Sequence, residues 1–328
     1  MDGMFARCEG AYSENTLRGY RNDLKHFQAW CASRELGWLP AAPQTIADFV
    51  DTQLETKAIS TIKHRVDAIK FAHRMADLRS PTDNSIVYLA LRRARRAHHR
   101  RPKQSAGLTS ELLAKIVAAC PGNLRGLRDA ALLSVGYDTL CRSYELAAMH
   151  VEHLNEDCSR IRIPITKSDP FGDGRIAYLS KATIMRLSAW LSAADLHDGP
   201  LFRGLHTRKL SDRPLDTSSI RRLIKAAAKR AGLEPATVRS LSGHSMRVGA
   251  AQDMMVAGAD IIGIMHAGGW KSHAVLSRYV ENASAELMHE RRWEGLKRLS
   301  NSVLRSEDLC RFGMPGAFGT RQASVPDA

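Results

Sequence analysis

The basic segment that ends near Gly107 most strongly constrains how this chain can fold. Seven of the residues from Leu91 to Lys103 are arginine or lysine, and Pro102 and Gly107 then interrupt any helix that precedes them. The chain has 328 residues, which is longer than one hydrophobic core usually supports. We therefore expect two domains and a loosely ordered C-terminal tail. The expected bounds are residues 1–103, 104–300 and 301–328.

The charge of the chain indicates a polyanionic partner. The formal net charge is +14, an excess that favours nucleic acid or an anionic membrane surface. No apolar run approaches the ~20 residues of a membrane-spanning helix, so we expect nucleic acid and no membrane partner. The like charges of residues 91–103 repel one another unless an anion neutralises them. We therefore favour phosphate contact there over a solvated helix end.

The chain carries no pattern typical of a metal or cofactor site. It has neither a Walker-type loop nor a close cluster of carboxylates, so no metal and no nucleotide is predicted. His150, His153 and Cys158 lack a second cysteine pair, which favours histidines at a helix boundary over a zinc site. The cysteines are scattered, and the N-terminus lacks the regions of a signal peptide. A cytoplasmic location is therefore expected.

The first hundred residues are predicted to be all-helical. Apolar residues recur at steps of three and four from Leu17 to Cys31, after possible N-caps at residues 13–16. A second helix is expected from Thr45 to Leu54, and a third carries apolar residues from Ile59 to Ile69 on one face. We expect the exposed side of this third helix to be basic. Its basic residues are Lys63, Arg65, Lys70 and Arg74.

The second domain is predicted to be mostly helical, with a small antiparallel sheet. One helix is expected to begin at Thr109, and another, with an interruption, covers residues 127–146. Residues 160–165 and 175–179 alternate between polar and apolar side chains across a turn rich in Gly, Asp and Pro, which predicts a hairpin. A basic helix is expected from about Thr217. The fold class is therefore mainly α.

The most specific motif lies near the C-terminal end. His244 stands three residues before Arg247, and Trp270 is followed nine residues later by Tyr279. Residues at i and i+3 share a helical face, so His244 and Arg247 can face the same phosphate. An imidazole can accept the proton of a tyrosine near neutral pH, and a guanidinium grips phosphate oxygens. Attack of a tyrosine on a phosphodiester also requires further charge stabilisation and an acid for the leaving oxygen.

With Arg142 and Lys167 added to this motif, the chain resembles the tyrosine recombinase (phage integrase) family, and in particular its Cre-like members. The likeness is densest over Ser242 to Tyr279 and extends to residues 139–146 and the Thr166–Lys167 pair. The resemblance implies an all-helical, SAM-like core-binding domain and a mostly helical catalytic domain. Together the two domains are expected to form a C-shaped clamp on DNA.

The resemblance also implies roles for single residues. Arg142 and Arg247 would grip the scissile phosphate, and Lys167 would protonate the departing 5′ oxygen. Tyr279 would form a 3′-phosphotyrosine, with His244 managing its proton. Taken alone, each of these residues also has an ordinary structural interpretation. A lysine in a turn, for example, is usually just solvated.

Two further residues are assigned to the catalytic set. Glu145 would orient an arginine or the histidine, although a plain helix salt bridge is the alternative. Trp270 would donate its indole N–H to the scissile phosphate, although most tryptophans simply belong to the core.

DNA contacts and assembly are also implied. The resemblance places helices around Arg18 and Lys63, and a helix near Ser218, in DNA grooves, with Arg222 and Lys225 as candidates for backbone contact. Residues 286–299 form an expected amphipathic helix, which either packs in cis or docks into a neighbouring subunit. Docking of that kind would close a tetrameric synapse on two DNA duplexes with inverted-repeat sites.

These features favour a site-specific DNA recombinase that religates strands through a Holliday junction without metal or ATP. Two alternatives stay open. One is strand relaxation like that of a type IB topoisomerase, and the other is a non-catalytic DNA-binding regulator on the same scaffold.

Overall fold

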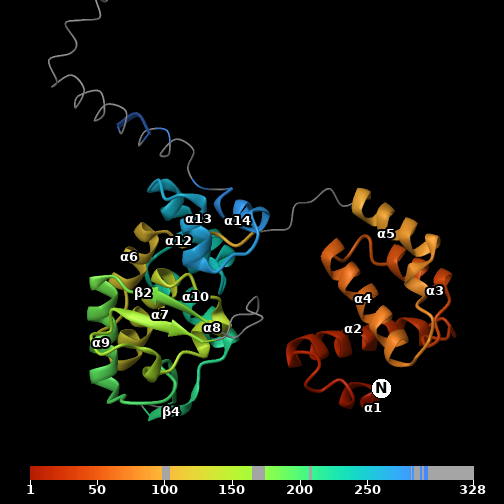
Figure 1. Cartoon of the computed structure of the whole chain (residues 1–328), viewed down its shortest axis with the longest axis horizontal. Helices are drawn as coiled ribbons and strands as arrows, with labels where there is room; N and C mark the ends of the chain where they lie inside the picture. Colours follow the sequence, from red (N-terminus) through yellow and green to blue (C-terminus); the bar gives the residue numbers. More distant parts are fainter. Residues whose placement is uncertain are drawn as a thin grey trace, which may run out of the picture. The chain divides into compact units, whose positions relative to one another are not determined.

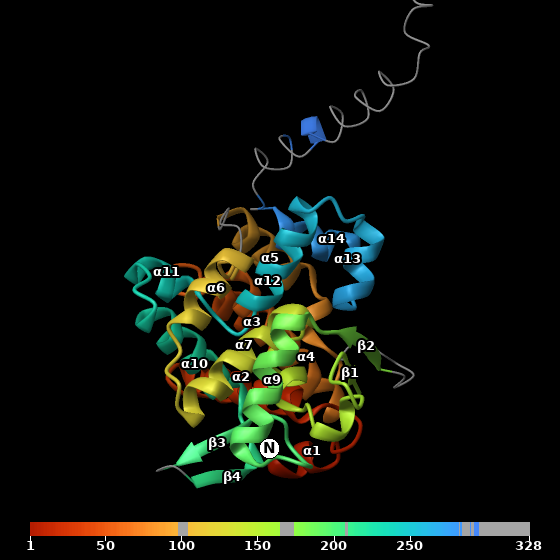
Figure 2. The ribbon, with the colours of Figure 1, turned by 90° about the vertical axis from the view of Figure 1, so that its left-hand side faces the viewer.

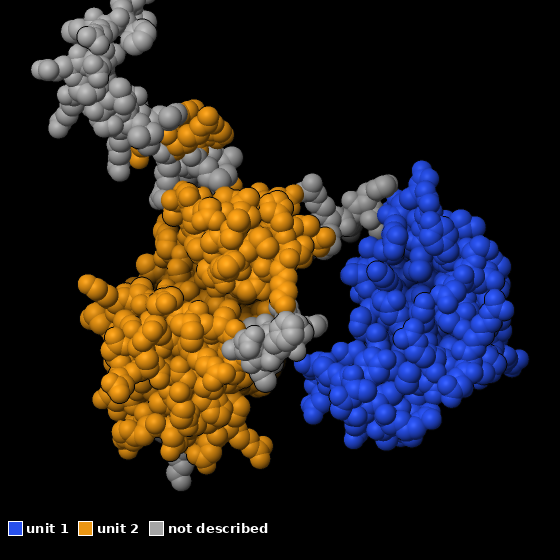
Figure 3. Space-filling view, in the orientation of Figure 1, with its two compact units in different colours: residues 1–103 blue, residues 104–328 orange. Residues whose placement is uncertain are grey.

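The chain divides into two compact units. The computed structural model describes residues 1–97, 104–164, 174–206 and 209–281, together with residues 283, 289 and 292–294. Unit 1 comprises Met1–Lys103 and unit 2 comprises Gln104–Ala328 (Figure 3).

Unit 1 is helical throughout its regular structure. Its elements are α1 (Asp2–Ala6), α2 (Glu14–Ala32), α3 (Pro43–Asp51), α4 (Ile59–Met75), the 3-10 helix η1 (Pro81–Asp83) and α5 (Ser85–Ala97). The three helices predicted from apolar periodicity are present as α2, α3 and α4. The Ser13 hydroxyl caps α2 by accepting from the Thr16 N–H at 3.2 Å. Contacts between α2 and α4 and between α3 and α5 enclose a core that includes Leu24, Phe27 and Ile62.

Arg65 does not belong to the exposed basic side expected for α4. It lies three residues after Ile62 and four before Ile69, so the helical period places all three on the inner face. Its side chain is buried, donates to the Gln53 side chain and lies 3.6 Å from Asp23. The prediction for Arg65 was wrong because charge alone does not reveal buried polar partners distant in sequence.

Unit 2 begins with a helical layer and continues into two hairpins. The elements in its first part are α6 (Ser110–Ala118), α7 (Leu124–Asp138), α8 (Ser143–Ala147), η2 (Val151–His153), β1 (Arg160–Ile163), β2 (Arg175–Tyr178) and α9 (Lys181–Ala194). The strands β1 and β2 pair antiparallel with Arg160 opposite Tyr178, which confirms the predicted hairpin. Ile161 and Ile163 are buried and Arg160 and Arg162 are exposed, as the alternation requires.

The remainder of unit 2 includes a second hairpin that the sequence did not predict. Its elements are β3 (Arg203–His206), β4 (Lys209–Pro214), α10 (Thr217–Arg230), α11 (Pro235–Ser240), α12 (Ser245–Val256), α13 (Ile261–Gly268) and α14 (His273–Val280). Strands β3 and β4 are short and mostly polar, so they show no apolar alternation that could mark them.

The helices α12, α13 and α14 gather at one end of unit 2, and the β3–β4 hairpin lies at the opposite end (Figures 1 and 2). These helices share a small core separate from the main one. The buried members of this core are Leu140, Ala250, Ala251, Ile264, Trp270 and Leu276. Of the motif residues, Trp270 and Tyr279 belong to this small core.

Several predicted features involve residues that the structure does not describe. Lys167 and the tail over residues 301–328 lie outside the described residues, as does most of the helix expected over residues 286–299. Among the described helices, none is both long and apolar enough to cross a membrane.

Candidate active site

Arg247 lies at the centre of the site. It projects from α12 and is completely buried. Its Nη1 donates to two backbone carbonyls, those of Leu140 and of Gly268 at 2.8 Å. Its Nε and Nη2 are buried and have no hydrogen-bond partner among the described residues. A buried cation with unpaired donors is costly unless an anion completes its hydrogen bonds.

The Gly268 carbonyl belongs to the last residue of α13, and the Leu140 carbonyl lies just beyond the C-cap of α7. The chain leaves α7 through Leu140, whose φ is 50°, and leaves α13 through Gly269, whose φ is 67°. The last carbonyls of a helix lack partners within it and carry partial negative charge. A guanidinium placed between two such ends is held at a fixed position.

Burial, together with the positive charge of Arg142, lowers the pKa of Arg247 to about 10. The side chain therefore remains protonated at neutral pH. It is a cation whose remaining donors favour a tetrahedral oxyanion such as a phosphodiester.

The aromatic rings of Trp270 and Tyr279 lie beside the Arg247 guanidinium. The guanidinium carbon lies 3.8 Å from the Trp270 ring centroid and 6.0 Å from that of Tyr279. The two aromatic rings meet edge to face, with centroids 5.3 Å apart. A Cβ at Gly268 would lie 1.9 Å from the Trp270 ring, so this stack requires glycine there. Tyr279 is half-buried on α14.

Arg142 and Glu145 form a paired unit at the start of α8. Arg142 Nη1 donates to Glu145 Oε1 at 2.7 Å, and the Arg142 backbone N–H donates to Oε2 at 2.9 Å. Burial lowers the pKa of Arg142, but the hydrogen bond and charge of Glu145 outweigh that effect and the net shift is upward. Glu145 is buried, whereas Arg142 is half-buried. The predicted contact between Glu145 and an arginine is therefore present, and both a plain salt bridge and an orienting role are consistent with it.

His244 is the N-cap residue of α12 and remains exposed on one side. Desolvation by the surrounding protein lowers its pKa, and the charges of Arg247 and Arg142 lower it further. The imidazole is therefore neutral at pH 7 and can accept a proton. The Ser143 hydroxyl donates to the Gly243 carbonyl at 3.0 Å, which ties α8 to the residue before His244.

The structure thus brings six predicted residues together from three distant segments: Arg142, Glu145, His244, Arg247, Trp270 and Tyr279. Lys167 lies outside the described residues. A guanidinium, a neutral imidazole and a tyrosine hydroxyl in one half-buried site can support nucleophilic attack on a phosphodiester.

Sequence reasoning missed two residues next to the site. Gln252 on α12 is buried, and its Nε2 donates to the Tyr279 carbonyl at 3.2 Å. Arg175 on β2 donates to the carbonyls of Thr139 and Ala267. The strand period could have revealed Arg175, because it lies on the same face as buried Ala177.

The candidate DNA contacts are distributed over both units. Arg18 and Lys63 are exposed on unit 1, and Ser218 and Arg222 are exposed on α10 of unit 2. Lys225 is half-buried, and its Nζ donates to the Arg239 carbonyl at 3.0 Å. Lys225 is therefore less available for DNA than its neighbour Arg222.

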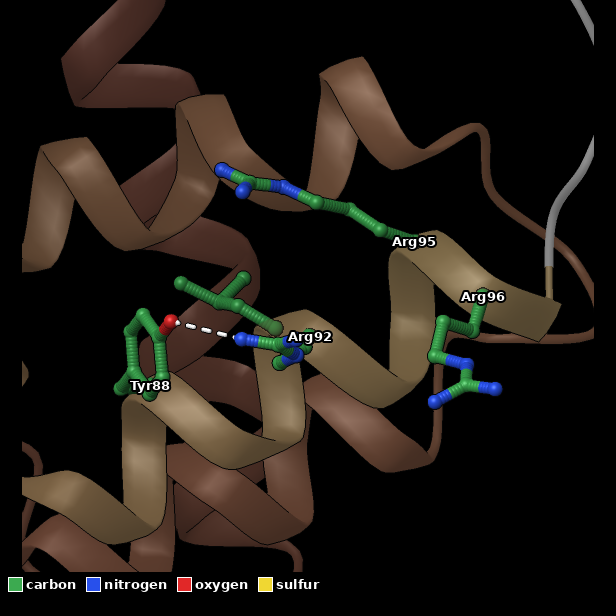
Figure 4. Close-up of a pocket in the computed structure, with 5 residues that line it drawn as sticks. Tyr88, Arg92, Arg95 and Arg96 are labelled. Atoms are coloured by element: carbon green, nitrogen blue, oxygen red, sulfur yellow. Dashed lines mark hydrogen bonds between the residues drawn. The ribbon is translucent and has the colours of Figure 1, made fainter.

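Part of the basic segment lines a recess on α5 (Figure 4). Its volume is about 290 Å³, and Arg92 Nη1 donates to the Tyr88 hydroxyl at 3.1 Å on one wall. Arg95 and Arg96 also line it. No group of three or more His, Cys, Asp or Glu side chains in the described ranges could hold a metal ion.

The curated relatives are recombinases. Recombinase Cre of Escherichia phage P1 is 29% identical over 303 residues, which cover 85% of this chain and 88% of Cre. An integrase/recombinase XerD homolog of Selenomonas ruminantium is 28% identical over 291 residues, which cover 85% of this chain and 84% of the relative.

Solved structures show the same fold. The Tn1549 transposon integrase in complex with circular intermediate DNA has a TM-score of 0.62 at 16% identity, covering 88% of this chain and 98% of that one. A lambda integrase dimer bound to a COC′ core site has a TM-score of 0.59 at 16% identity, covering 87% and 96%.

Two family models match consecutive parts of the chain. The N-terminal SAM-like domain of phage integrases matches residues 7–78. The phage integrase family itself matches residues 107–286, which is more than half of the chain. The chain therefore belongs to the phage integrase family of tyrosine recombinases.

Proposed function

We propose that this tyrosine recombinase cuts and rejoins DNA at specific sites, with Tyr279 as its nucleophile. One observation carries the proposal. Arg247 is a fully buried cation with two unpaired donors, and it lies 6.0 Å from the Tyr279 ring. Such donors suit the non-bridging oxygens of a phosphodiester, whose charge grows in the transition state.

The remaining residues divide the chemistry among them. Arg142, held by Glu145, shares the phosphate charge with Arg247. Neutral His244 accepts the proton of the attacking Tyr279 hydroxyl. Trp270 supports Arg247 and contributes its indole N–H to the phosphate.

The reaction conserves the number of phosphodiester bonds. The Tyr279 oxygen forms a bond to phosphorus while the bond to the 5′ oxygen breaks, and that oxygen leaves as a hydroxyl after taking a proton. The family resemblance assigns this proton to Lys167. A 5′ hydroxyl from the partner duplex then displaces Tyr279, so rejoining requires no ATP.

DNA binding follows from charge and from the relatives. The chain carries a formal net charge of +14, and the Tn1549 and lambda integrase structures contain DNA. We assign residues 1–103 to core-type DNA binding, 104–300 to catalysis and 301–328 to a tail. We assign DNA contact first to four residues and after them to Lys225. The four are Arg18, Lys63, Ser218 and Arg222.

The full assembly is also part of this proposal. Four copies that exchange the helix expected over residues 286–299 would hold two duplexes with inverted-repeat sites together for strand exchange. The same series of steps requires a Holliday junction between the first and second pair of cleavages.

A covalent capture experiment tests the nucleophile. The protein is incubated with a pool of random-sequence duplexes that carry a nick, so that the short strand diffuses away after cleavage. We expect a protein–DNA adduct that survives denaturation, disappears in Tyr279→Phe and persists in Tyr178→Phe, whose tyrosine is 70% exposed on β2. Sequencing the captured DNA would then give the target site.

Two outcomes would favour the alternatives. Relaxation of supercoiled plasmids that lack any captured site would support a topoisomerase. Tight DNA binding with no adduct on any sequence would support a non-catalytic regulator.

A further inference from the structure

We propose that Arg175 is a positioning residue for cleavage, which holds the two turns that present the phosphate-binding groups. This inference rests on the proposed recombinase function. It concerns the residue on β2 that sequence reasoning did not single out.

Arg175 and Arg247 bridge the same two segments in parallel. Arg247 Nη1 donates to the carbonyls of Leu140 and Gly268. Arg175 Nη2 donates to Thr139 at 2.6 Å, and its Nη1 donates to Ala267 at 2.7 Å. Each residue whose carbonyl accepts from Arg175 is therefore adjacent in the chain to one whose carbonyl accepts from Arg247.

The carbonyls explain why a guanidinium is needed. Thr139 caps the end of α7, and Ala267 belongs to the last turn of α13. Terminal helix carbonyls lack internal partners, and a planar fork can satisfy one from each helix at once. A lysine ammonium offers no such fixed pair of donors.

The two turns lead directly to catalytic side chains. Arg142 follows Thr139 by three residues, and Trp270 follows Ala267 by three. A displacement of either turn would move a group that grips or supports the phosphate. Misplacement of a catalytic group by 1 Å can cost roughly 10²-fold in rate.

Two other roles for Arg175 fit less well. Direct phosphate contact is disfavoured because both Nη atoms already donate to backbone carbonyls. Of the Arg175 nitrogens, only Nε is buried without a hydrogen-bond partner among the described residues, whereas Arg247 has both Nε and Nη2 in that state. A purely stabilising role is disfavoured because Arg175 adds its positive charge to that of Arg142 beside Arg247, an interaction that lowers the Arg247 pKa. The geometry of the turns explains this placement better than charge does.

The test uses Arg175→Met and Arg175→Lys in the full chain, with Arg160→Met as the matched control. Arg160 is an exposed arginine on the paired strand β1. Single-turnover adduct formation on a captured nicked duplex gives a rate constant and an amplitude. A positioning role lowers the rate constant, whereas partial unfolding lowers the amplitude.

We expect Arg175→Met to lose roughly 10²-fold in rate constant, with the amplitude and the affinity for DNA retained. Arg175→Lys should recover part of the loss through one donor, and Arg160→Met should cleave like the parent. A parental rate constant in Arg175→Met, or a loss confined to amplitude, would overturn the inference.

A second substrate separates Arg175 from the leaving-group acid. Replacing the bridging 5′ oxygen by sulfur gives a leaving group that needs no proton. We expect Arg175→Met to lose the same factor on both substrates, whereas Lys167→Ala should recover on the sulfur substrate. Recovery of Arg175→Met would contradict the inference, because its defect would then lie in protonation. Absence of an adduct in the parent would instead refute the proposed function.

Discussion

Arg247 and Trp270 form a stacked pair, with the guanidinium carbon 3.8 Å from the centroid of the indole ring. The stack covers one face of the guanidinium, while two carbonyls hold its Nη1 at the edge. The orientation of the cation is thus fixed before DNA arrives. Preorganised donors of this kind avoid reorganisation during the reaction.

Replacing Trp270 tests this support. Trp270→Ala removes a buried ring and should lower the free energy of unfolding by about 3–5 kcal/mol, measured by urea titration. Trp270→Phe should keep most of the stability and still cleave more slowly, because it lacks the indole N–H. A Trp270→Phe variant that cleaves at the parental rate would show that this N–H does not contact the phosphate.

Arg247→Lys should reduce the rate of adduct formation by roughly 10²–10³-fold, the usual effect of removing a transition-state donor. The ammonium keeps the charge but cannot reach both carbonyls and the phosphate together. Affinity for DNA, measured by gel shift, should change little because we expect many other cations to contact the backbone. A loss seen in affinity alone would contradict the assigned role.

Cleavage should depend on the protonation of His244. Its pKa in the free protein lies below the ordinary value of 6.5, so the neutral base persists to lower pH than for a free histidine. At limiting protein, adduct formation should fall with decreasing pH through a midpoint below 6.5. This decrease of adduct formation at low pH should be absent in His244→Asn. Stability shifts the same way, because the unfolded histidine takes up its proton first and folding weakens as pH falls below about 6.5.

Glu145→Gln should misplace Arg142. The substitution removes a charged acceptor from a buried pair and should lower stability by about 1.5–3 kcal/mol, measured by thermal unfolding, together with a slower cleavage rate. In an Arg142→Met background the same substitution should have a much smaller effect on rate. Equal effects in both backgrounds would show that Glu145 does not act through Arg142.

Gly107→Ala should slow cleavage although residue 107 is far from Tyr279 in sequence. A Cβ there would lie 2.0 Å from Gln252 Oε1 and would displace the amide that donates to the Tyr279 carbonyl. Gly122→Ala is the matched control, because a Cβ at Gly122 meets open space. Single-turnover rates should fall for the first variant only, and Gln252→Met should reproduce the loss.

Much of the fold could be predicted from local sequence patterns. Helices α2, α3 and α4 and the β1–β2 hairpin could be predicted because their apolar periods are regular. Most of the candidate site could be predicted from the family resemblance of its motifs. The burial of Arg65 could not, since it depends on Asp23 of α2 and on Gln53 in the turn after α3. The strand period could have shown that Arg175 lies on the inner face. Its partners could not be predicted, because the carbonyls of Thr139 and Ala267 leave no mark on residue type.

The unpaired Nε and Nη2 of Arg247 also affect how the folded chain responds to its substrate. An anion that binds there binds the native state and not the unfolded one, so mass action stabilises the fold by about 2.7 kcal/mol at a hundredfold excess over Kd. Resistance to heat and to proteases therefore becomes a measure of site occupancy. The chain should be hardest to unfold at the moment when a phosphodiester is in place to be cut.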